Sequence, residues 1–260
     1  MEYKKIAESI LLEAGEILKK NFGKVRKIST KKNWQDLVTS VDVEANKLIV
    51  SKLKKHFPDH TIISEELPEK SGDFDYVWFV DPLDGTTNYT LSIPFFSTAL
   101  ALLKKGKPFL GMVYNPVTQE FFCGISGRGS WLNGRRIRVS KNSDIKKTLI
   151  NYCHVNRPED VRLISKIYYK MKLLGRDFRR LGSAGLDICW VACGRNDVWF
   201  HPSVGNLWDI LPGLVIAKEA GAKITDWQGR NWMMGKSKDI LITNGKVHKV
   251  ILEILCKVKK

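Results

Sequence analysis

The spacing of apolar residues predicts helices at the start of the chain and strands in its middle. Apolar side chains recur at helical spacing from Ile6 to Leu18, against a charged opposite face, which predicts a helix over residues 3–21. A similar stripe predicts a second helix over 43–56, with Asp42 in the N-cap position. Short apolar runs separated by turn residues then predict strands over 61–64, 76–81, 96–104, 108–115, 120–125, 127–132 and 135–139.

The pattern changes after residue 155, where helices and short strands alternate. Apolar stripes predict helices over 159–173, 184–193, 210–220 and 247–258, with short strands over 197–200, 223–225 and 239–243. The sequence contains no internal repeat, low-complexity stretch or long linker. We therefore expect two tightly joined halves, residues 1–145 and 146–260, in one compact unit.

Length and composition exclude several classes of protein. A chain of 260 residues with 43% hydrophobic residues can bury a sizeable core, which excludes wholesale disorder, collagen and coiled coil. No apolar run approaches the roughly 18 residues that span a bilayer, and the charged N-terminal stretch is unlike a signal peptide. The five cysteines are scattered, without a C-x-x-C pair. We expect a reduced, cytoplasmic compartment and no membrane partner.

The net charge of +16 suggests nucleic acid, a membrane surface or a negatively charged substrate as the partner. The charge is unevenly distributed, however. Residues 131–180 hold fourteen basic and four acidic side chains, whereas residues 56–130 hold five basic and nine acidic ones. A nucleic-acid-binding protein has no evident need for that acidic segment, but a site that holds metal cations does.

The most informative stretch of sequence is the acidic motif D-P-L-D-G-T-T-N at residues 81–88. It follows a predicted strand, and Pro and Gly in a tight turn let the carboxylates of Asp81 and Asp84 converge. Two carboxylates and the Leu83 carbonyl are oxygen ligands that suit Mg²⁺. The N–H groups of Gly85 and Thr86 suit a phosphate oxygen. A lone D-x-x-D-G is equally compatible with an ordinary polar turn, but the longer string is far more specific.

Other acidic residues stand at the ends of predicted elements. Glu65 and Glu66 follow the strand 61–64, and Asp42 and Asp209 stand at the starts of helices. Each alone is explained as a surface pair or a helix cap. Together, four segments place acidic side chains at strand or helix ends, which favours one shared metal site.

With these motifs the chain resembles the inositol monophosphatase family, within the Mg²⁺-dependent, Li⁺-sensitive sugar phosphatases. The resemblance rests on Trp78–Asn88, on Ser64-Glu65-Glu66, on Leu207-Trp208-Asp209 with Ala217-x-x-Ala220-Gly221, and more weakly on residues 36–42. It implies an α/β fold, a five-layer αβαβα sandwich of the inositol monophosphatase and fructose-1,6-bisphosphatase type. It also implies a homodimer.

The resemblance assigns roles to matching residues. Two to three Mg²⁺ ions would be held by Glu65, Asp81, the Leu83 carbonyl, Asp84 and Asp209. Glu65 and Thr86 would orient and deprotonate the attacking water, while Asp42 would assist a third, weaker metal or its waters. The substrate would be bound by Gly85, Thr86, Arg180, Gly182, Ser183, Ala184 and Asp209. An Asp84→Asn variant should then lose activity through the metal site and leave the fold intact.

The substrate expected from the resemblance is a small phosphorylated molecule, inositol monophosphate first. The family's sugar-contacting glutamate, seven positions before Asp209, is replaced by Pro202, and the neighbouring His201 is either a contact or a structural residue. Fructose-1,6-bisphosphatase, histidinol-phosphatase and nucleotide or NADP phosphatase therefore stay open as alternatives. An RNA-binding or regulatory role through the basic residues 131–180 is the alternative of a different class.

Overall fold

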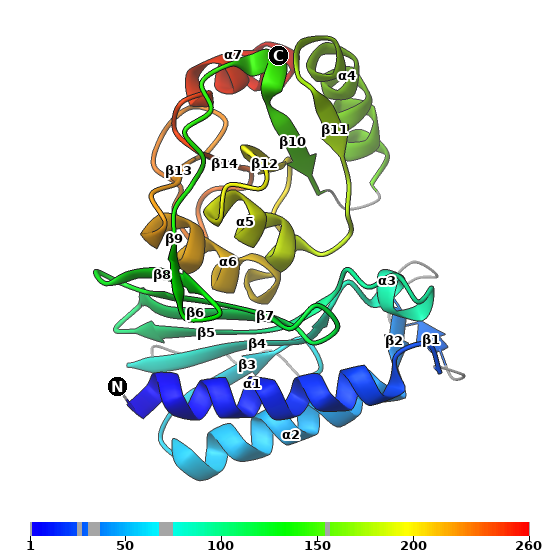
Figure 1. Cartoon of the computed structure of the whole chain (residues 1–260), viewed down its shortest axis with the longest axis vertical. Coiled ribbons are helices and arrows are strands. Elements are labelled where there is room, and N and C mark those ends of the chain that lie inside the picture. Colours follow the sequence, from blue (N-terminus) through cyan, green and yellow to red (C-terminus); the bar gives the residue numbers. More distant parts are fainter. Residues whose placement is uncertain (1, 25–27, 31–36, 68–74, 154–156, 260) are drawn as a thin grey trace.

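Five alternating layers of helix and sheet stack along the long axis of the molecule (Figure 1), as the resemblance implies. The computed structural model describes residues 2–24, 28–30, 37–67, 75–153 and 157–259. Within these ranges, no helix is long and apolar enough to cross a bilayer. Where the boundary between the two halves falls stays a prediction.

The first layer consists of two N-terminal helices. α1 (Glu2–Asn21) and α2 (Ser40–His56) bury their apolar stripes against one face of a sheet, where Ile10 and Ile49 are fully buried. The prediction that Asp42 caps the second helix is wrong. Thr39 is the N-cap, and Asp42, three residues later, accepts the Thr39 N–H over 2.8 Å in a capping box.

The second layer is a seven-stranded sheet whose strands follow one another in chain order. Only the first pair of strands is parallel, and the remaining pairs are antiparallel. Its strands are β3 (Thr61–Ser64), β4 (Tyr76–Asp84), β5 (Ser97–Lys104), β6 (Lys107–Asn115), β7 (Glu120–Ile125), β8 (Gly129–Leu132) and β9 (Arg135–Ile137).

The middle layer, α5 (Ala184–Ala192) and α6 (Leu207–Glu219), lies between the two sheets (Figure 1). α6 packs very closely on the seven-stranded sheet, because two glycines face it. A Cβ at Gly111 would stand 2.3 Å from the Pro212 carbonyl oxygen, and one at Gly124 would stand 2.6 Å from the Ile216 Cα. These glycines therefore allow the close approach of α6 to the sheet.

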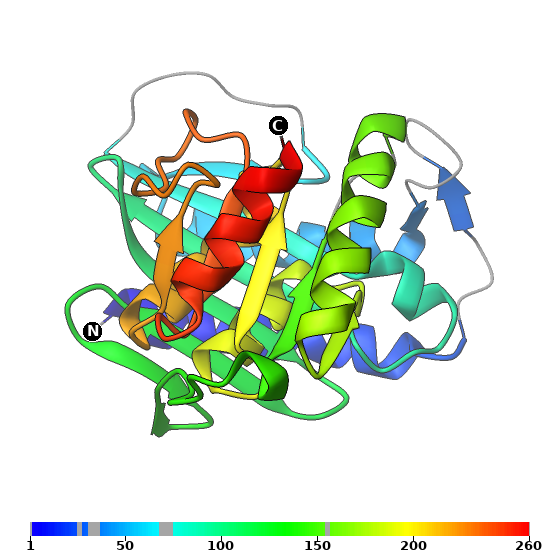
Figure 2. The same ribbon diagram turned by 90° about the horizontal axis from the view of Figure 1, so that it is seen from above.

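The outer layers are a five-stranded sheet, in the order β11-β10-β12-β14-β13, and two helices that cover it (Figure 2). The strands are β10 (Leu149–Tyr152), β11 (Asp177–Arg179), β12 (Val198–His201), β13 (Lys223–Thr225) and β14 (Ile240–Thr243), and the helices are α4 (Pro158–Leu174) and α7 (His248–Lys259). Four short elements complete the described part of the chain: β1 (Ile28–Thr30), β2 (Leu37–Thr39), α3 (Thr86–Thr90) and the 3₁₀ turn η1 (Ile145–Lys147).

Candidate active site

The acidic motif lies at the C-terminal end of β4, and it is not the turn that its sequence predicts. β4 continues through Asp84, and its pairing with β5 shifts between Asp81, opposite Ala99, and Asp84, opposite Ser97. Pro82 and Leu83 of β4 thus lie opposite the single residue Thr98 of β5, which is a β-bulge. Gly85 then takes a φ of 91°, which favours glycine, and α3 follows. The bulge brings both carboxylates to one end of the strand.

Glu65 lies beside this motif because β3 runs parallel to β4. The register pairs Ser64 with Val80, and the Glu65 N–H donates to the Val80 carbonyl over 3.2 Å. Parallel strands end at the same edge of a sheet, so the residue after β3 meets the residue after Val80, which is Asp81.

Asp84 joins β4 to the N-terminus of α5. Its Oδ1 accepts the Ala184 N–H over 3.1 Å, and its Oδ2 accepts the Gly185 N–H over 2.8 Å and the Ser183 hydroxyl over 2.5 Å. Ser97 adds a weaker contact to Oδ2 at 3.3 Å. Burial raises the pKa of Asp84, and these hydrogen bonds oppose the increase. Oδ1 carries one donor and Oδ2 three, so Oδ1 has more capacity for a further partner.

Asp209 reaches the site from α6. The helix begins at Leu207, after Asn206 at the N-cap, so the prediction that Asp209 itself caps a helix starting at 210 is wrong. Asp209 lies in the first turn, and Pro212 lies inside the helix. The Asp209 carboxylate is close enough to Asp81 to contribute to raising its pKa.

Asp42 and Thr86 are linked behind the pocket wall. The Thr86 hydroxyl lies 3.4 Å from Asp42 Oδ1 and 3.1 Å from the Leu83 carbonyl oxygen, both of which are acceptors. Burial raises the pKa of Asp42, while hydrogen bonds from Thr39 lower it. The Thr86 hydroxyl donates to one of these two acceptors, so its oxygen can still accept hydrogen bonds.

The predicted substrate segment packs directly against the motif, and Asn88 helps to hold it there. The Asn88 side-chain amide donates to the Leu181 and Phe95 carbonyls, each over 2.7 Å. Gly182 has a φ of 91°, and a Cβ there would meet the Asn88 amide at 3.0 Å. The sequence places Asn88 in the motif but gives no signal for its distant partner at residue 181.

The site is a pocket of about 280 Å³. Ten of the twelve predicted residues line it, and Asp42 and Ser183 instead contact residues that line it. Thr87 and Cys153 line it too, although neither was predicted. Burial raises the pKa of the Cys153 thiol to about 12, which disfavours the thiolate form. His201 is not among the lining residues. The lining is formed by Glu65, Asp81, Leu83, Asp84, Gly85, Thr86, Thr87, Cys153, Arg180, Gly182, Ala184 and Asp209.

The chemistry of this pocket fits a divalent cation. Burial raises the pKa of Asp81 well above its usual range, and repulsion by Glu65, Asp84, Asp209 and Asp42 adds to the increase. In the parts of the chain described, no three Asp, Glu, His or Cys side chains are already placed as a set that could hold a metal. The fit therefore rests on the chemical type of the oxygen atoms in the pocket. Several carboxylates and one carbonyl surround a buried carboxyl group, and such oxygens are the ligands of a hard cation.

Comparison with known proteins decides the family. The sequence profile of the Inositol monophosphatase family matches residues 1–260. The chain belongs to the inositol monophosphatase family. Members of this family are phosphatases, so the protein is a phosphoric monoester hydrolase.

Several relatives in the inositol monophosphatase family align with most of this chain. Inositol monophosphatase 1 of Solanum lycopersicum is 36% identical over 98% of the chain and 94% of the relative. The "Fructose-1,6-bisphosphatase/inositol-1-monophosphatase" of Thermotoga maritima is 35% identical over 95% and 93%, and the "Nus factor SuhB" of Pasteurella multocida is 37% identical over 84% and 82%. The solved Thermotoga maritima IMPase superposes with a TM-score of 0.92 at 33% identity, covering 99% of this chain and 98% of that one.

Proposed function

We propose that this protein is a Mg²⁺-dependent phosphatase of small phosphorylated polyols, with inositol monophosphate as the first candidate substrate. The observation that carries the proposal is the gathering of acids from four separate elements around one buried aspartate, Asp81, whose pKa their charges help to raise. Such a group is costly without a cation.

Mg²⁺ would be held by Glu65, Asp81, the Leu83 carbonyl, Asp84 and Asp209, two to three ions in all. When bound, it would neutralise charge on the phosphoryl group and make a water easier to deprotonate. Of the two Asp84 oxygens, Oδ1 is the better metal ligand, because Oδ2 already accepts three hydrogen bonds.

The protein's own residues would position the water and accept its proton. The Thr86 hydroxyl donates toward Asp42 or the Leu83 carbonyl, so its oxygen can accept a hydrogen bond from a water in the pocket. Glu65, on the same wall, would accept the proton. No residue need form a covalent phosphoryl intermediate, and Cys153, protonated at neutral pH, is unsuited to that role.

The phosphate and the sugar would be bound by residues of both the acidic motif and the segment 180–184. Arg180 brings a positive charge into a pocket otherwise rich in carboxylates, which suits a phosphate ester. The N–H groups of Gly85 and Thr86 would hold phosphate oxygens. Since Pro202 replaces the family's glutamate and His201 does not line the pocket, the sugar would contact Arg180, Cys153 and Asp209 instead. Such contacts favour a broad preference, as in the relative that carries both activity names.

The test is phosphate release from a substrate panel with and without Mg²⁺. The panel contains inositol 1-phosphate, fructose 1,6-bisphosphate, histidinol phosphate and NADP. We expect Mg²⁺-dependent release from inositol 1-phosphate, inhibition by Li⁺, and loss of activity in an Asp81→Asn variant. If the protein releases phosphate from none of these substrates with Mg²⁺ present, the proposal is wrong.

A second candidate role is RNA binding by the outer face of α4. Arg162, Lys166 and Lys170 are exposed on this helix, next to the exposed ring of Tyr169, and one relative is named a Nus factor. Such binding would weaken steeply with salt. A gel shift of single-stranded RNA that survives in Asp81→Asn but is lost in Lys166→Glu/Lys170→Glu would support it. The homodimer stays a prediction for light scattering to test.

A further inference from the structure

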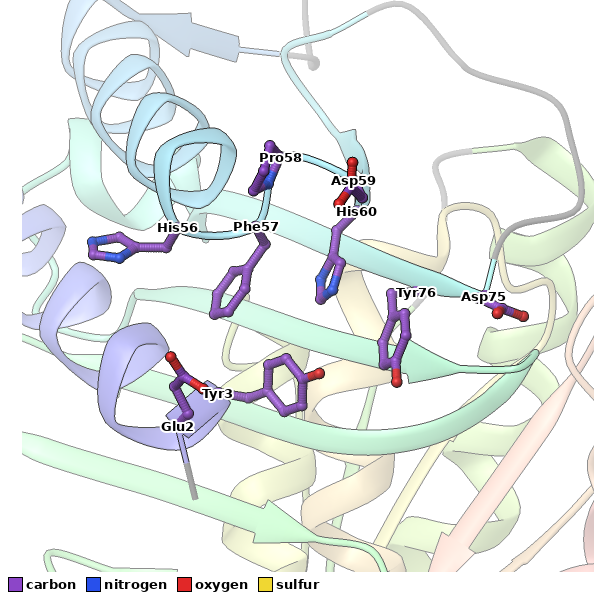
Figure 3. Close-up of a pocket in the computed structure, with 9 residues that line it drawn as sticks. All are labelled: Glu2, Tyr3, His56, Phe57, Pro58, Asp59, His60, Asp75 and Tyr76. Atoms are coloured by element: carbon purple, nitrogen blue, oxygen red, sulfur yellow. The ribbon is translucent and has the colours of Figure 1, made fainter.

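A second, larger pocket lies at the opposite end of β4 from the catalytic pocket. It encloses about 580 Å³, and it forms where α1 begins, α2 ends and β4 begins (Figure 3). β4 connects the two pockets, because Tyr76, its first residue, lines this one and Asp84, its last residue, lines the other. No residue that lines this pocket belongs to the proposed catalytic site.

One wall of this pocket is a cluster of four rings from three segments of the chain. His60 stacks between Phe57, at 4.9 Å and 12°, and Tyr76, at 4.5 Å and 4°. Tyr3 lies across them, with its ring centroid 5.4 Å from Phe57, 5.8 Å from His60 and 5.9 Å from Tyr76. The rings therefore form a continuous and mutually supported cluster, in which Phe57 is buried and Tyr3, His60 and Tyr76 are partly exposed.

The ring cluster itself is neutral at physiological pH. Burial lowers the pKa of His60, and the Trp78 indole donates to His60 Nδ1 over 3.0 Å. Nδ1 is thus the acceptor, so the proton of the neutral ring is on Nε2. Burial, followed by a hydrogen bond with Tyr76, raises the pKa of Tyr3. No ring of the cluster carries a positive charge that would repel a cation.

Three exposed carboxylates surround the rings. Figure 3 shows Glu2, Asp59 and Asp75 on different sides of the cluster. Within the described ranges, no lysine or arginine forms an ion pair with any of the three. This arrangement is notable in a chain with 43 basic and 27 acidic side chains. A basic protein therefore presents an acidic rim around an aromatic wall.

The rings of this region already accept a cation. Lys104 Nζ stands 5.7 Å from the Tyr76 ring centroid and 5.9 Å from that of Phe109. Aromatic faces attract ammonium groups through the ring quadrupole, and carboxylates nearby strengthen the attraction. Because the carboxylates lie on separate sides of the rings, a ligand with several spaced positive charges would meet more of them than a single ion would.

We propose that this pocket binds a small organic polycation of the alkyl polyamine class. Its methylene segments would lie on Tyr3, because His60 and Lys104 already cover the Tyr76 ring, and its ammonium groups would lie near Glu2, Asp59 and Asp75. The volume is within the range of small-molecule sites. The inference does not depend on the catalytic proposal, because the two pockets share no residue.

The experiment is calorimetric titration of the full-length protein with spermidine, without Mg²⁺ and at low salt. We expect a micromolar dissociation constant that weakens by about tenfold or more in Asp59→Asn/Asp75→Asn and in Tyr3→Leu. Glu253→Gln, which removes an exposed acid on α7, serves as the matched control and should bind as the wild type does. Asp81→Asn should also bind normally, since it alters only the catalytic pocket.

Three results would overturn the proposal. The first is no heat of binding in the wild type. The second is weakening in Asp59→Asn/Asp75→Asn without weakening in Tyr3→Leu, which means attraction to acidic surface alone. The third is loss of binding in Asp81→Asn, which places the polyamine in the catalytic pocket. Circular dichroism of each variant before titration separates lost binding from lost folding.

Discussion

Asn151 and Asp187 form a buried pair directly behind the N-terminus of α5. The Asn151 side-chain amide donates to Asp187 Oδ1 over 2.7 Å, and both residues are at most 1% exposed. Asn151 Oδ1 has no hydrogen-bond donor among the described residues. Burial raises the pKa of Asp187 well above its usual range, and repulsion by Asp84 adds to the increase. A protonated Asp187 could donate to that unpaired oxygen, so that each residue satisfies the other.

The first prediction is that Asp187→Asn leaves the fold and the activity intact. An amide reproduces both hydrogen bonds of a protonated carboxyl group, so the free energy of unfolding should change by less than about 1 kcal/mol at pH 4 and should not fall at pH 7. Asp187→Leu leaves Asn151 unpaired and should cost about 2 kcal/mol or more. Urea denaturation measures both values.

The pH dependence of this pair has a defined sign. A folded-state pKa above the unfolded value means that the folded state binds more protons, so Asp187 makes the wild type less stable as pH rises above about 4. The Asn variant lacks this loss. Its stability relative to the wild type should therefore be greater at pH 7 than at pH 4, and the opposite trend would show that Asp187 is ionised.

The second prediction separates two aspartates of the motif. Asp81 accepts one hydrogen bond among those described, from the Leu83 N–H over 3.1 Å, and it is repelled by its neighbours. Asp81→Asn should reduce kcat by at least about 100-fold if the cation is lost. Its melting temperature without Mg²⁺ should be unchanged or raised, because a buried charge is removed.

Asp84→Asn should behave differently, which corrects the expectation that it spares the fold. Asp84 accepts donors at the start of α5 on both of its oxygens, and the amide nitrogen that replaces one oxygen in asparagine cannot accept the donors on that side. The variant should lose about 2 kcal/mol or more of stability together with activity. Thermal unfolding of the two variants side by side tests the difference. Equal melting temperatures would contradict it.

The sequence predicted most elements of the fold but misplaced two helix starts in the same way. The sequence predicts Asp42 and Asp209 as N-caps, whereas each lies three residues after the true cap, Thr39 or Asn206. An acid is favourable at either position, because both are near the positive end of the helix dipole. A pattern of residue types alone cannot distinguish the N-cap position from the position three residues later. The choice of Asp42 and Asp209 as site candidates did not depend on which of these positions they occupy.

Other features depend on contacts between distant residues, so they left little sequence signal. β10 has only four residues, including Asn151, and β11 has three, Asp177–Arg179, so neither shows an alternating pattern. Both are strands because they pair in parallel with each other, and β10 also pairs with β12. Asn88, Cys153 and the aromatic pocket were missed for the same reason. Their partners are far away along the chain.

The third prediction concerns the close packing of α6 on the seven-stranded sheet. Gly111→Ala places a Cβ 2.3 Å from the Pro212 carbonyl oxygen, so α6 must shift. The overpacking should cost about 1–3 kcal/mol, and kcat should fall because Asp209 is carried on the same helix. Gly205→Ala is the control, because a Cβ there meets nothing within 4 Å. A variant that matches the control in both stability and kcat would show that α6 adapts without moving Asp209.

The fourth prediction is an acid-dependent loss of stability that His248 causes. His248, 1% exposed, lies between Thr225 Oγ1, at 3.1 Å from Nε2, and Thr243 Oγ1, at 2.9 Å from Nδ1. Burial lowers its pKa to about 4, and repulsion by Lys223 adds to the decrease. Between pH 6.5 and 4 the unfolded chain therefore binds a proton that the folded protein does not, so stability falls as pH falls.

The loss that His248 causes should reach at most about 3 kcal/mol at pH 4, and none of it should be present above pH 7. His248→Gln keeps a donor and an acceptor near the two threonines but does not titrate. Its stability should consequently fall less steeply than that of the wild type between pH 7 and 4, as measured by urea denaturation at each pH. Parallel curves for the two proteins would mean that His248 is protonated in the folded state and that its burial does not govern acid unfolding.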